Sequence, residues 1–479
     1  MNQVSTAPSL RFTRAEVRIT AILLAVIAVG SFWLASNRTF DPNYAQPGSN
    51  AAWPSDFYRQ QALSLLDGRL DVPFQEGAFT ECFFRDSQCY GYFGVVPSLL
   101  RLVGFAATAS TTTNPGPVII ATGVTTAVWA AIFLAVGVAK LSPTREQLTQ
   151  RSRLWLIVLV GALLGPGGIL TFLSQSKLYY EAVVMMIAGL MVAFAGAHRW
   201  VATRRPGYLV IAIGGAACAA NSRPTAIIAA LVLGVGIVVL ALRGPVADRR
   251  RDALLGGGIA LLPAASAFGI VWLKLREFSP SWPTYTLYNS QKMQELLREN
   301  DGVLQGPRFI VNHLVNYLRP DSLARIDNWP WVQHAIDNQR PVITIPPITP
   351  ESLYIELVAS LPNTMPVALV LTIGFSAMAI VGIVRFTSAQ RQAFVILILA
   401  AATVPFGALT MYALTTRYLG DFYPVLAVGT VFGLVWLLES AQPHQLRFRL
   451  ITIGILASAM ITTVINFGLQ LQTFTNLIG

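Results

Sequence analysis

Long apolar runs alternate with short polar stretches along most of the chain. A helix needs about 20 predominantly apolar residues to cross roughly 30 Å of hydrocarbon. The pattern therefore predicts an all-α polytopic membrane protein with about eleven transmembrane helices, near residues 18–36, 116–139, 154–174, 179–197, 207–221, 224–242, 254–273, 364–384, 392–412, 422–438 and 450–470. The fifth of these segments is short, and its boundary with the sixth is the least sharply marked.

A further apolar stretch at residues 95–108 is interrupted by Pro97 and Arg101. We interpret it as an interfacial or re-entrant segment, because counting it as a span would invert every later loop. The predicted topology leaves two long segments on one side of the membrane, at about 37–115 and 274–363. No repeat of 20–50 residues and no low-complexity tract divides the chain. We therefore expect one membrane-embedded domain over residues 1–479, whose working face carries the two long loops.

The composition supports a membrane protein. Hydrophobic residues make up 54% of the 479 residues and charged residues 12%, against roughly 45–50% and 25% in soluble domains. The net charge of +11 is concentrated in the short loops that face the cytoplasm if the amino terminus lies inside, as at Arg249, Arg250 and Arg251. This distribution is the positive-inside pattern, so the charge reflects topology and does not indicate nucleic-acid binding. It predicts a multi-pass protein of the plasma membrane whose amino terminus is cytoplasmic and whose long loops are extracytoplasmic. The first span is longer than the 7–15 apolar residues of a cleaved signal peptide, so we expect a retained anchor.

Two cysteines, Cys82 and Cys89, lie in the first outer loop, on the side of the membrane where disulfides persist. We expect them to form a disulfide, the alternative being two free thiols. Cys218 falls within a span, where a cysteine most often serves as a small packing residue.

An amphipathic helix is predicted upstream of these cysteines, in PSDFYRQQALSLLDGRLDVP. Its apolar residues recur at helical spacing, and Gly68 is a natural stop. Such a helix is expected to lie on the outer membrane surface. Asp56 stands at its first turn, where the helix dipole keeps a carboxylate ionised. From the local sequence, Asp56 either caps the helix, a role that Ser55 also suits, or takes part in chemistry.

Several charged residues are predicted at the outer ends of the spans, although a charge at a helix centre costs about 2.5–3.5 kcal/mol. Arginine can bind phosphate oxygens through two N–H groups, and lysine adds a point charge. A nearby carboxylate can take a proton from a hydroxyl group. The set therefore suits a phosphate-bearing lipid, the alternative being interfacial anchors or ion pairs between helix ends. It comprises Lys177 and Glu181 in SQSKLYYEAV, Arg223 in NSRPT, and Arg417 and Asp421 in TTRYLGDFYP.

An inside amino terminus, one span and an outer helix opening with SDFYRQQALSLLDGR resemble the GT-C superfamily of integral-membrane glycosyltransferases, including actinobacterial arabinofuranosyl- and mannosyltransferases. CYGYFGVVPSLLRL, KLYYEA, SRPT and RYLGDFYP resemble further elements of that superfamily. The resemblance implies transfer of a sugar from a polyprenyl-phosphate donor to a glycan, glycolipid or protein acceptor of the cell envelope, with inversion. Arabinofuranose or mannose is the sugar we expect.

The resemblance also implies roles for individual residues. Asp56 would be the catalytic base, with Asp41 in reserve. Arg417, Arg223 and Lys177 would bind the donor phosphate, whereas Glu181, Tyr58 and Tyr179 or Tyr180 would contact sugar or acceptor. Glu181 could alternatively orient Lys177. Many relatives carry paired acids where this chain has Asp56 followed by Phe57, so no metal site is assigned and a divalent cation (Mg²⁺ or Mn²⁺) stays open.

The second outer loop is rich in aromatic and amide side chains that suit sugar rings, although Trp and Tyr also anchor proteins at membrane interfaces. They are Trp282, Tyr285, Tyr288, Asn289, Gln291, Tyr317, Trp329 and Trp331. We expect His313 and His334 to be packing residues and not metal ligands. Three rivals remain to the glycosyltransferase: a lipid-linked oligosaccharide ligase or polymerase, a membrane transporter or flippase, and a non-catalytic scaffold.

Overall fold

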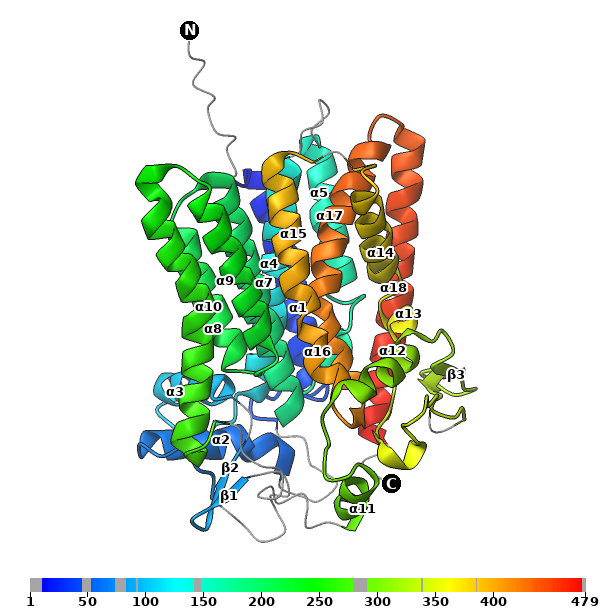
Figure 1. Ribbon diagram of the computed structural model, residues 1–479. Helices are drawn as coiled ribbons and strands as arrows, with labels where there is room; N and C mark the ends of the chain where they lie inside the picture. Colours follow the sequence, from blue (N-terminus) through cyan, green and yellow to red (C-terminus); the bar gives the residue numbers. More distant parts are fainter. Residues whose placement is uncertain are drawn as a thin grey trace.

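The computed structural model describes residues 11–44, 53–73, 83–91, 94–141, 148–278, 291–336, 339–384 and 386–475. Most of this chain forms a bundle of helices that run between two ends of the molecule (Figure 1). The bundle helices are α1 (Arg14–Ala35), α4 (Gly116–Lys140), α5 (Gln150–Leu164), α7 (Leu178–Thr203), α8 (Gly207–Ala220), α9 (Ala226–Leu242), α10 (Val246–Leu275), α14 (Pro366–Ile380), α15 (Ser388–Ala402), α17 (Tyr423–Ala441) and α18 (Gln445–Thr475).

Each of the predicted spans overlaps one of these helices. Within the described residues, seven stretches are long and apolar enough to cross a membrane, and α8, α9 and α14 are shorter apolar helices. A polytopic helical membrane protein is therefore confirmed, whereas eleven crossings stay a prediction.

Shorter elements connect the bundle helices. They are α2 (Trp53–Leu66), β1 (Phe83–Arg85), β2 (Gln88–Tyr90), α3 (Val96–Thr108), α6 (Leu170–Leu173), α11 (Gln291–Glu299), η3 (Pro307–Phe309), α12 (Ile310–Leu318), β3 (Leu323–Arg325), β4 (Val332–His334), η4 (Pro350–Ser352), β5 (Tyr354–Ile355), α13 (Leu361–Thr364), α16 (Val404–Leu409), β6 (Ala413–Leu414) and η5 (Thr416–Phe422). The strands form three two-stranded ladders, β1–β2 and β3–β4 antiparallel and β5–β6 parallel.

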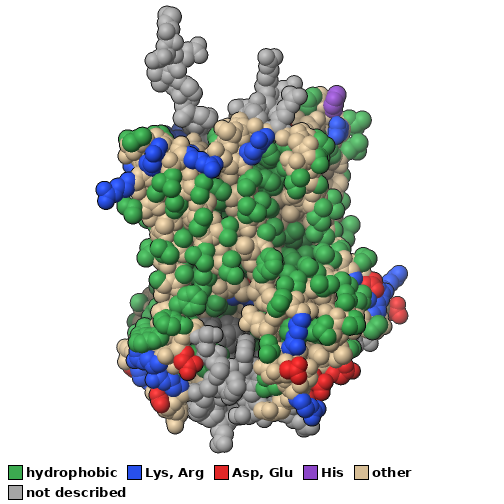
Figure 2. Space-filling view, in the orientation of Figure 1, with side chains coloured by type: hydrophobic (Ala, Val, Ile, Leu, Met, Phe, Trp, Pro, Cys, Tyr) green, Lys and Arg blue, Asp and Glu red, His purple; other side chains and the backbone are tan. Residues whose placement is uncertain are grey.

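The two ends of the bundle differ in composition. We call the end at which α1 begins the N-side and the opposite end, with α2, α3, α11 and α12, the loop side (Figure 1). On the face shown in Figure 2, apolar side chains cover the middle of the molecule, and basic side chains without acidic ones lie at the N-side. Acidic and basic side chains are mixed at the loop side. The predicted charge asymmetry is therefore present on this folded surface.

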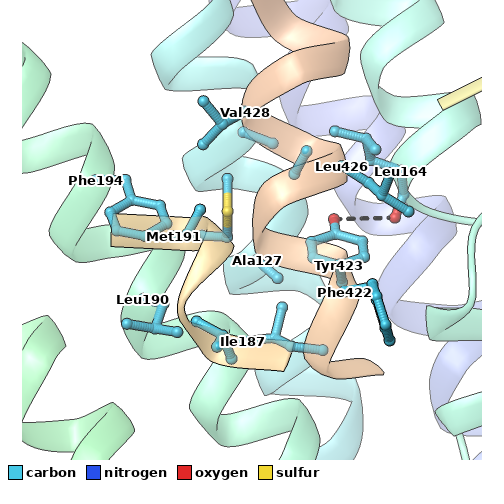
Figure 3. Packing of buried hydrophobic residues seen from close by; sticks show 14 of the residues in the cluster. Ala127, Leu164, Ile187, Leu190, Met191, Phe194, Phe422, Tyr423, Leu426 and Val428 are labelled. Atoms are coloured by element: carbon cyan, nitrogen blue, oxygen red, sulfur yellow. Dashed lines mark hydrogen bonds between the residues drawn. The ribbon is translucent and has the colours of Figure 1, made fainter. Parts of the chain in front are cut away.

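Three helices form the centre of the bundle. In the most apolar stretch of each, 89% of residues are buried in α7, 83% in the η5–α17 segment and 67% in α4, against 17% in the peripheral α1. Figure 3 shows side chains of this core, including Met191 and Tyr423. The Tyr423 hydroxyl donates to the carbonyl oxygen of Leu164 at 3.1 Å, which satisfies one of the carbonyls left without an intrahelical partner at the end of α5.

Helix α2 confirms the predicted amphipathic helix but corrects its orientation. Phe57, Tyr58 and Ala62 are buried as expected, whereas Leu66 is 58% exposed and the polar Gln61 is buried. Gln61 accepts a hydrogen bond from Ser98 of α3 at 2.6 Å. The periodicity indicated a buried face but not what covers it, and here that face packs against α3 and α7. The predicted stop at Gly68 is confirmed, with φ of 71°.

Candidate functional site

Two of the predicted cations meet at the loop side around one aromatic ring. The guanidinium carbons of Arg223 and Arg417 lie 5.1 and 5.6 Å from the ring centre of Tyr418. Arg223 comes from the turn between α8 and α9, and Arg417 from η5. The Arg417 guanidinium also lies 3.9 Å from the ring centre of Tyr179 at the start of α7. Segments almost 200 residues apart in sequence therefore supply cations to one cluster.

Glu356 joins this cluster from the second of the two long loops. The parallel β5–β6 ladder pairs Ile355 with Leu414 and so brings Glu356 beside the segment that leads into η5. Arg417 Nη1 donates to both carboxylate oxygens of Glu356, at 3.1 and 2.8 Å, and Thr415 Oγ1 donates to Oε2 at 2.8 Å. The sequence interpretation missed Glu356, although it is a single acid in the otherwise mostly apolar stretch SLYIELVAS.

Lys177 lies close enough to Glu356 and Arg417 for both charges to act on its ammonium group. It precedes α7, and its ammonium is 5.7 Å from the ring centre of Tyr180. Burial lowers the Lys177 pKa to about 8; the Glu356 carboxylate acts in the opposite direction, and Arg417 lowers the pKa further. All three cations predicted to bind phosphate thus lie in one connected region.

Arg223 forms an ion pair with Asp421, at 2.8 Å between Nη2 and Oδ2. The Asp421 side chain is fully buried and the Arg223 side chain is 13% exposed. Ion pairing between helix ends, the alternative weighed for these residues, is therefore present. A guanidinium carries five N–H donors, so such a pair is compatible with a second anionic partner.

The sequence interpretation missed a second ion pair, in which Arg101 binds Glu181. Arg101 Nη1 and Nη2 donate to the two carboxylate oxygens of Glu181 at 2.7 and 2.9 Å, and both side chains are buried. Arg101 Nε donates to Asn114 at 3.1 Å, and its guanidinium lies 5.5 Å from the ring centre of Tyr58. Glu181 is therefore bound by Arg101, which the sequence marks only as an interruption of an apolar run, and the suggestion that Glu181 orients Lys177 stays a prediction.

The structure describes the side chain of the reserve base Asp41 but not that of the first candidate, Asp56. Asp56 stands in the first turn of α2, but its side chain lies outside the described residues. The next residues, Phe57 and Tyr58, are buried, and Tyr58 lies beside Arg101. The reserve candidate Asp41 is exposed in a turn after α1, where its Oδ1 accepts from the Asn43 amide at 2.9 Å.

The predicted sugar-contacting residues of the second long loop are only partly described. Trp282, Tyr285, Tyr288 and Asn289 lie outside the described residues, as does the side chain of Gln291. The expectation for Tyr317 is corrected: its ring is fully buried, and its hydroxyl donates to the Thr415 carbonyl at 3.0 Å. Trp329 and Trp331 are each 52% exposed, in an edge-to-face pair with ring centres 4.5 Å apart.

The two histidines of this loop are buried. The ring nitrogens of His313 each lie 2.8 Å from a backbone carbonyl oxygen, of Phe309 and of Ala413. Burial lowers the pKa of His313, and it lowers the pKa of His334 to about 4. Both therefore sit in protein interior as neutral side chains at pH 7.

The two cysteines of the first long loop are also only partly described. Cys89 is buried and disulfide-bonded, whereas Cys82 lies outside the described residues. The Cys82–Cys89 pairing therefore stays a prediction. Cys218 is a free cysteine.

The described carboxylates of the cluster and of the Arg101–Glu181 pair do not fit a divalent cation. Glu181, Glu356 and Asp421 are each bound by an arginine. Within the ranges that the structure describes, no group of three or more His, Cys, Asp or Glu side chains is placed to hold a metal ion.

Comparison with known proteins gives a fold. No protein-family model matches the chain, and no curated protein sequence does. Among solved structures, the oligosaccharyltransferase of Archaeoglobus fulgidus in its apo form matches with a TM-score of 0.52 and 15% identity, over 94% of this chain and 56% of that chain. The same protein tethered to an acceptor peptide matches with a TM-score of 0.52 and 13% identity, over 94% and 55%. Its complex with Zn and sulfate matches with a TM-score of 0.52 and 14% identity, over 93% and 53%.

This chain therefore spans about half the length of its structural neighbours. At this level of identity the likeness is one of fold. The likeness shows a fold shared with this oligosaccharyltransferase, whereas the resemblance to the GT-C superfamily stays a prediction.

Proposed function

We propose that this protein is an integral-membrane glycosyltransferase that takes its sugar from a polyprenyl-phosphate donor. The observation that carries the proposal is the meeting of Lys177, Arg223 and Arg417 at the loop-side end of an apolar bundle. A lipid-linked phosphate has an anionic group at the membrane surface and a tail among apolar helices, which matches this arrangement. The fold shared with an oligosaccharyltransferase supports it.

The cations would stabilise the phosphate as it leaves, because charge develops on that group while the bond to the sugar breaks. Arg417 is the first choice, and Arg223 and Lys177 are next. The carboxylates paired with the two arginines hold each guanidinium in place before the donor arrives. Glu181 acts through Arg101 as a positioning residue, and it fixes the surroundings of Tyr58 and the start of α2.

Asp56 is proposed as the base. Its carboxylate takes the proton of the acceptor hydroxyl, whose oxygen forms a bond to the anomeric carbon. The bond from that carbon to the phosphate oxygen breaks on the opposite face, and the lipid phosphate leaves with the electron pair. The configuration at the anomeric carbon is inverted. No group of three or more His, Cys, Asp or Glu side chains among the described residues could hold a metal ion, and no step is assigned to one.

The test is transfer from a radiolabelled polyprenyl-monophosphate sugar by the wild type and by Asp56→Asn. General base catalysis contributes about 10²- to 10⁴-fold, so we expect a loss of that size. Asp67→Asn is the matched control, because Asp67 is exposed just after the other end of α2. Asp41→Asn tests the reserve base. Equal transfer by wild type and Asp56→Asn would reject Asp56 as the base.

The finer assignments belong to the same proposal. Arabinofuranose or mannose is the proposed sugar and a cell-envelope glycan, glycolipid or protein the acceptor, on the extracytoplasmic side of the plasma membrane. The structural neighbours favour a second candidate, a lipid-linked oligosaccharide donor. Offering the purified protein both donor types separates the two, because each enzyme class should use only its own. No transfer from either donor would favour a transporter or a scaffold.

A further inference from the structure

A groove lies at the N-side of the bundle, at the end opposite the cation cluster. It has a volume of about 480 Å³ and runs between the first turns of α5 and of α18. Its lining combines charged, amide, hydroxyl, aromatic and aliphatic side chains, among them Arg151, Trp155, Gln445, Arg449, Thr452 and Leu456. The site proposed for glycosyl transfer uses none of these residues.

The lining changes from charged to apolar with depth along α18. Arg449, Thr452 and Leu456 recur at helical spacing on one face of that helix. With a rise of 1.5 Å per residue, Arg449 stands about 10 Å nearer the N-side end than Leu456. On α5, the charged Arg151 is likewise followed one helical turn later by the aromatic Trp155. Ile453, which also lines the groove, is 63% exposed, so the apolar part opens toward the surrounding lipid.

Arg151 and Arg449, at the mouth of the groove, differ from the nearby Arg153 in their interactions with the protein. Arg153 binds the buried Glu16 at 2.6 Å, which ties α5 to α1. Arg151, two residues earlier, is exposed, as is Arg449, and neither has an ion pair or side-chain hydrogen bond with the described part of the chain. Two arginines that line one groove and have no carboxylate partner among the described residues are arranged to receive an anion from outside.

We propose that this groove binds the head group and upper acyl chains of an anionic glycerophospholipid from the leaflet at the N-side. Arg151 and Arg449 bind the phosphate, Trp155 lies at the level of the glycerol, and Ile453 and Leu456 contact the acyl chains. Arginine matches phosphate through two parallel N–H donors, and tryptophan favours the membrane interface. A soluble anion would use the mouth of the groove but not its apolar floor, so the lipid accounts for the whole lining.

The experiment measures binding of the first lipid to the purified full-length protein in detergent by native mass spectrometry. Phosphatidylglycerol, phosphatidylcholine and inorganic phosphate are the probes. We expect phosphatidylglycerol to bind about tenfold more tightly than phosphatidylcholine, and excess inorganic phosphate not to displace it. The double variant Arg151→Gln/Arg449→Gln should lose about tenfold or more in affinity for phosphatidylglycerol.

Two further variants separate the groove from general surface charge. Arg250→Gln/Arg447→Gln removes the same charge from exposed N-side positions that do not line the groove, and its affinity should stay within twofold of wild type. Leu456→Trp keeps both arginines but fills the apolar floor, and it should weaken binding about tenfold. Equal losses in the two double variants, equal binding of both lipids, or displacement by inorganic phosphate would each overturn the proposal. Lipid binding is measured without donor or acceptor, so this result is independent of the proposed transfer activity.

Discussion

Glu181 and Arg101 are joined by two hydrogen bonds within a fully buried ion pair. Burying both charges carries a desolvation cost that their attraction roughly offsets, whereas removing one partner leaves an uncompensated charge at a cost of about 3–5 kcal/mol. The pair therefore contributes chiefly to geometry. It fixes α3 against the start of α7, and both Tyr58 and Asn114 contact the guanidinium.

Lys177 gives the proposed site a pH dependence. Because its pKa is lowered to about 8, the Lys177 side chain carries a positive charge below this pH. It loses that charge as the pH rises through about 8. If Lys177 binds the donor phosphate, kcat/KM for transfer should fall above about pH 8, because kcat/KM reports the ionisation of the free enzyme. Lys177→Arg keeps the charge at high pH, so the alkaline fall should move upward by at least about one pH unit.

Lys140→Arg is the control for that measurement, because Lys140 ends α4 at the N-side, far along the bundle from the cluster. Its pH profile should match the wild type. An alkaline fall at the same pH in wild type and Lys177→Arg would remove Lys177 from the phosphate site.

The residues that could be predicted were those with a strong local signal. Lys177, Arg223 and Arg417 were identified because charges between long apolar runs are costly to bury and fall at the ends of spans. Arg101 and Glu356 were missed as site residues because each forms its ion pair with a residue that is distant in the sequence. Arg101 needs Glu181, 80 positions later, and Glu356 reaches Arg417 through a ladder of two residue pairs. No local periodicity reports such contacts.

At the scale of elements, the docking of α3 depends on a close backbone approach at Gly94. A Cβ added there would lie 1.6 Å from the carbonyl oxygen of Asn221, and the Val96 amide donates to the same oxygen at 3.3 Å. Because the obstacle is backbone, it cannot rotate away. Gly94→Ala should therefore push α3 from the turn that also carries Arg223.

We expect Gly94→Ala to destabilise the protein by about 1–3 kcal/mol and to lower transfer activity. Thermal unfolding of the detergent-solubilised protein, followed with the transfer assay, measures both. Gly257→Ala on α10 is the matched control: an added Cβ there meets nothing within 4 Å, and the change should be neutral or stabilising by about 0.5–1 kcal/mol. Equal melting temperatures for wild type and Gly94→Ala would show that α3 docks differently.

The elements themselves were largely predictable, since each apolar run produced a helix. The orientation of α2 was not, because an amphipathic pattern identifies a buried face without identifying its partner. Leu66, which fits the apolar spacing, is exposed, and the polar Gln61 is buried against Ser98. The buried Gln61 Oε1 has a hydrogen-bond partner there only because α3 supplies a donor, which is information from outside the helix.

At the scale of the whole molecule, the two ends of the bundle are chemically different, with basic side chains at the N-side and mixed charges at the loop side (Figure 2). Because basic loops are retained in the cytoplasm, we expect the loop side to be extracytoplasmic. This orientation can be measured with single cysteines in a Cys218→Ser background, in which Cys89 is already disulfide-bonded. Arg250→Cys places a thiol at the N-side, and Glu351→Cys places one in η4 at the loop side; both positions are exposed.

A membrane-impermeant maleimide applied to intact cells should label Glu351→Cys and leave Arg250→Cys unlabelled, whereas both should react after the membrane is permeabilised. The Cys218→Ser background without an added cysteine gives the baseline. The reverse pattern in intact cells would place the cation cluster in the cytoplasm, where a donor presented from the outer leaflet could not reach it. The same two variants thus test the topology and, through it, the compartment in which the proposed transfer takes place.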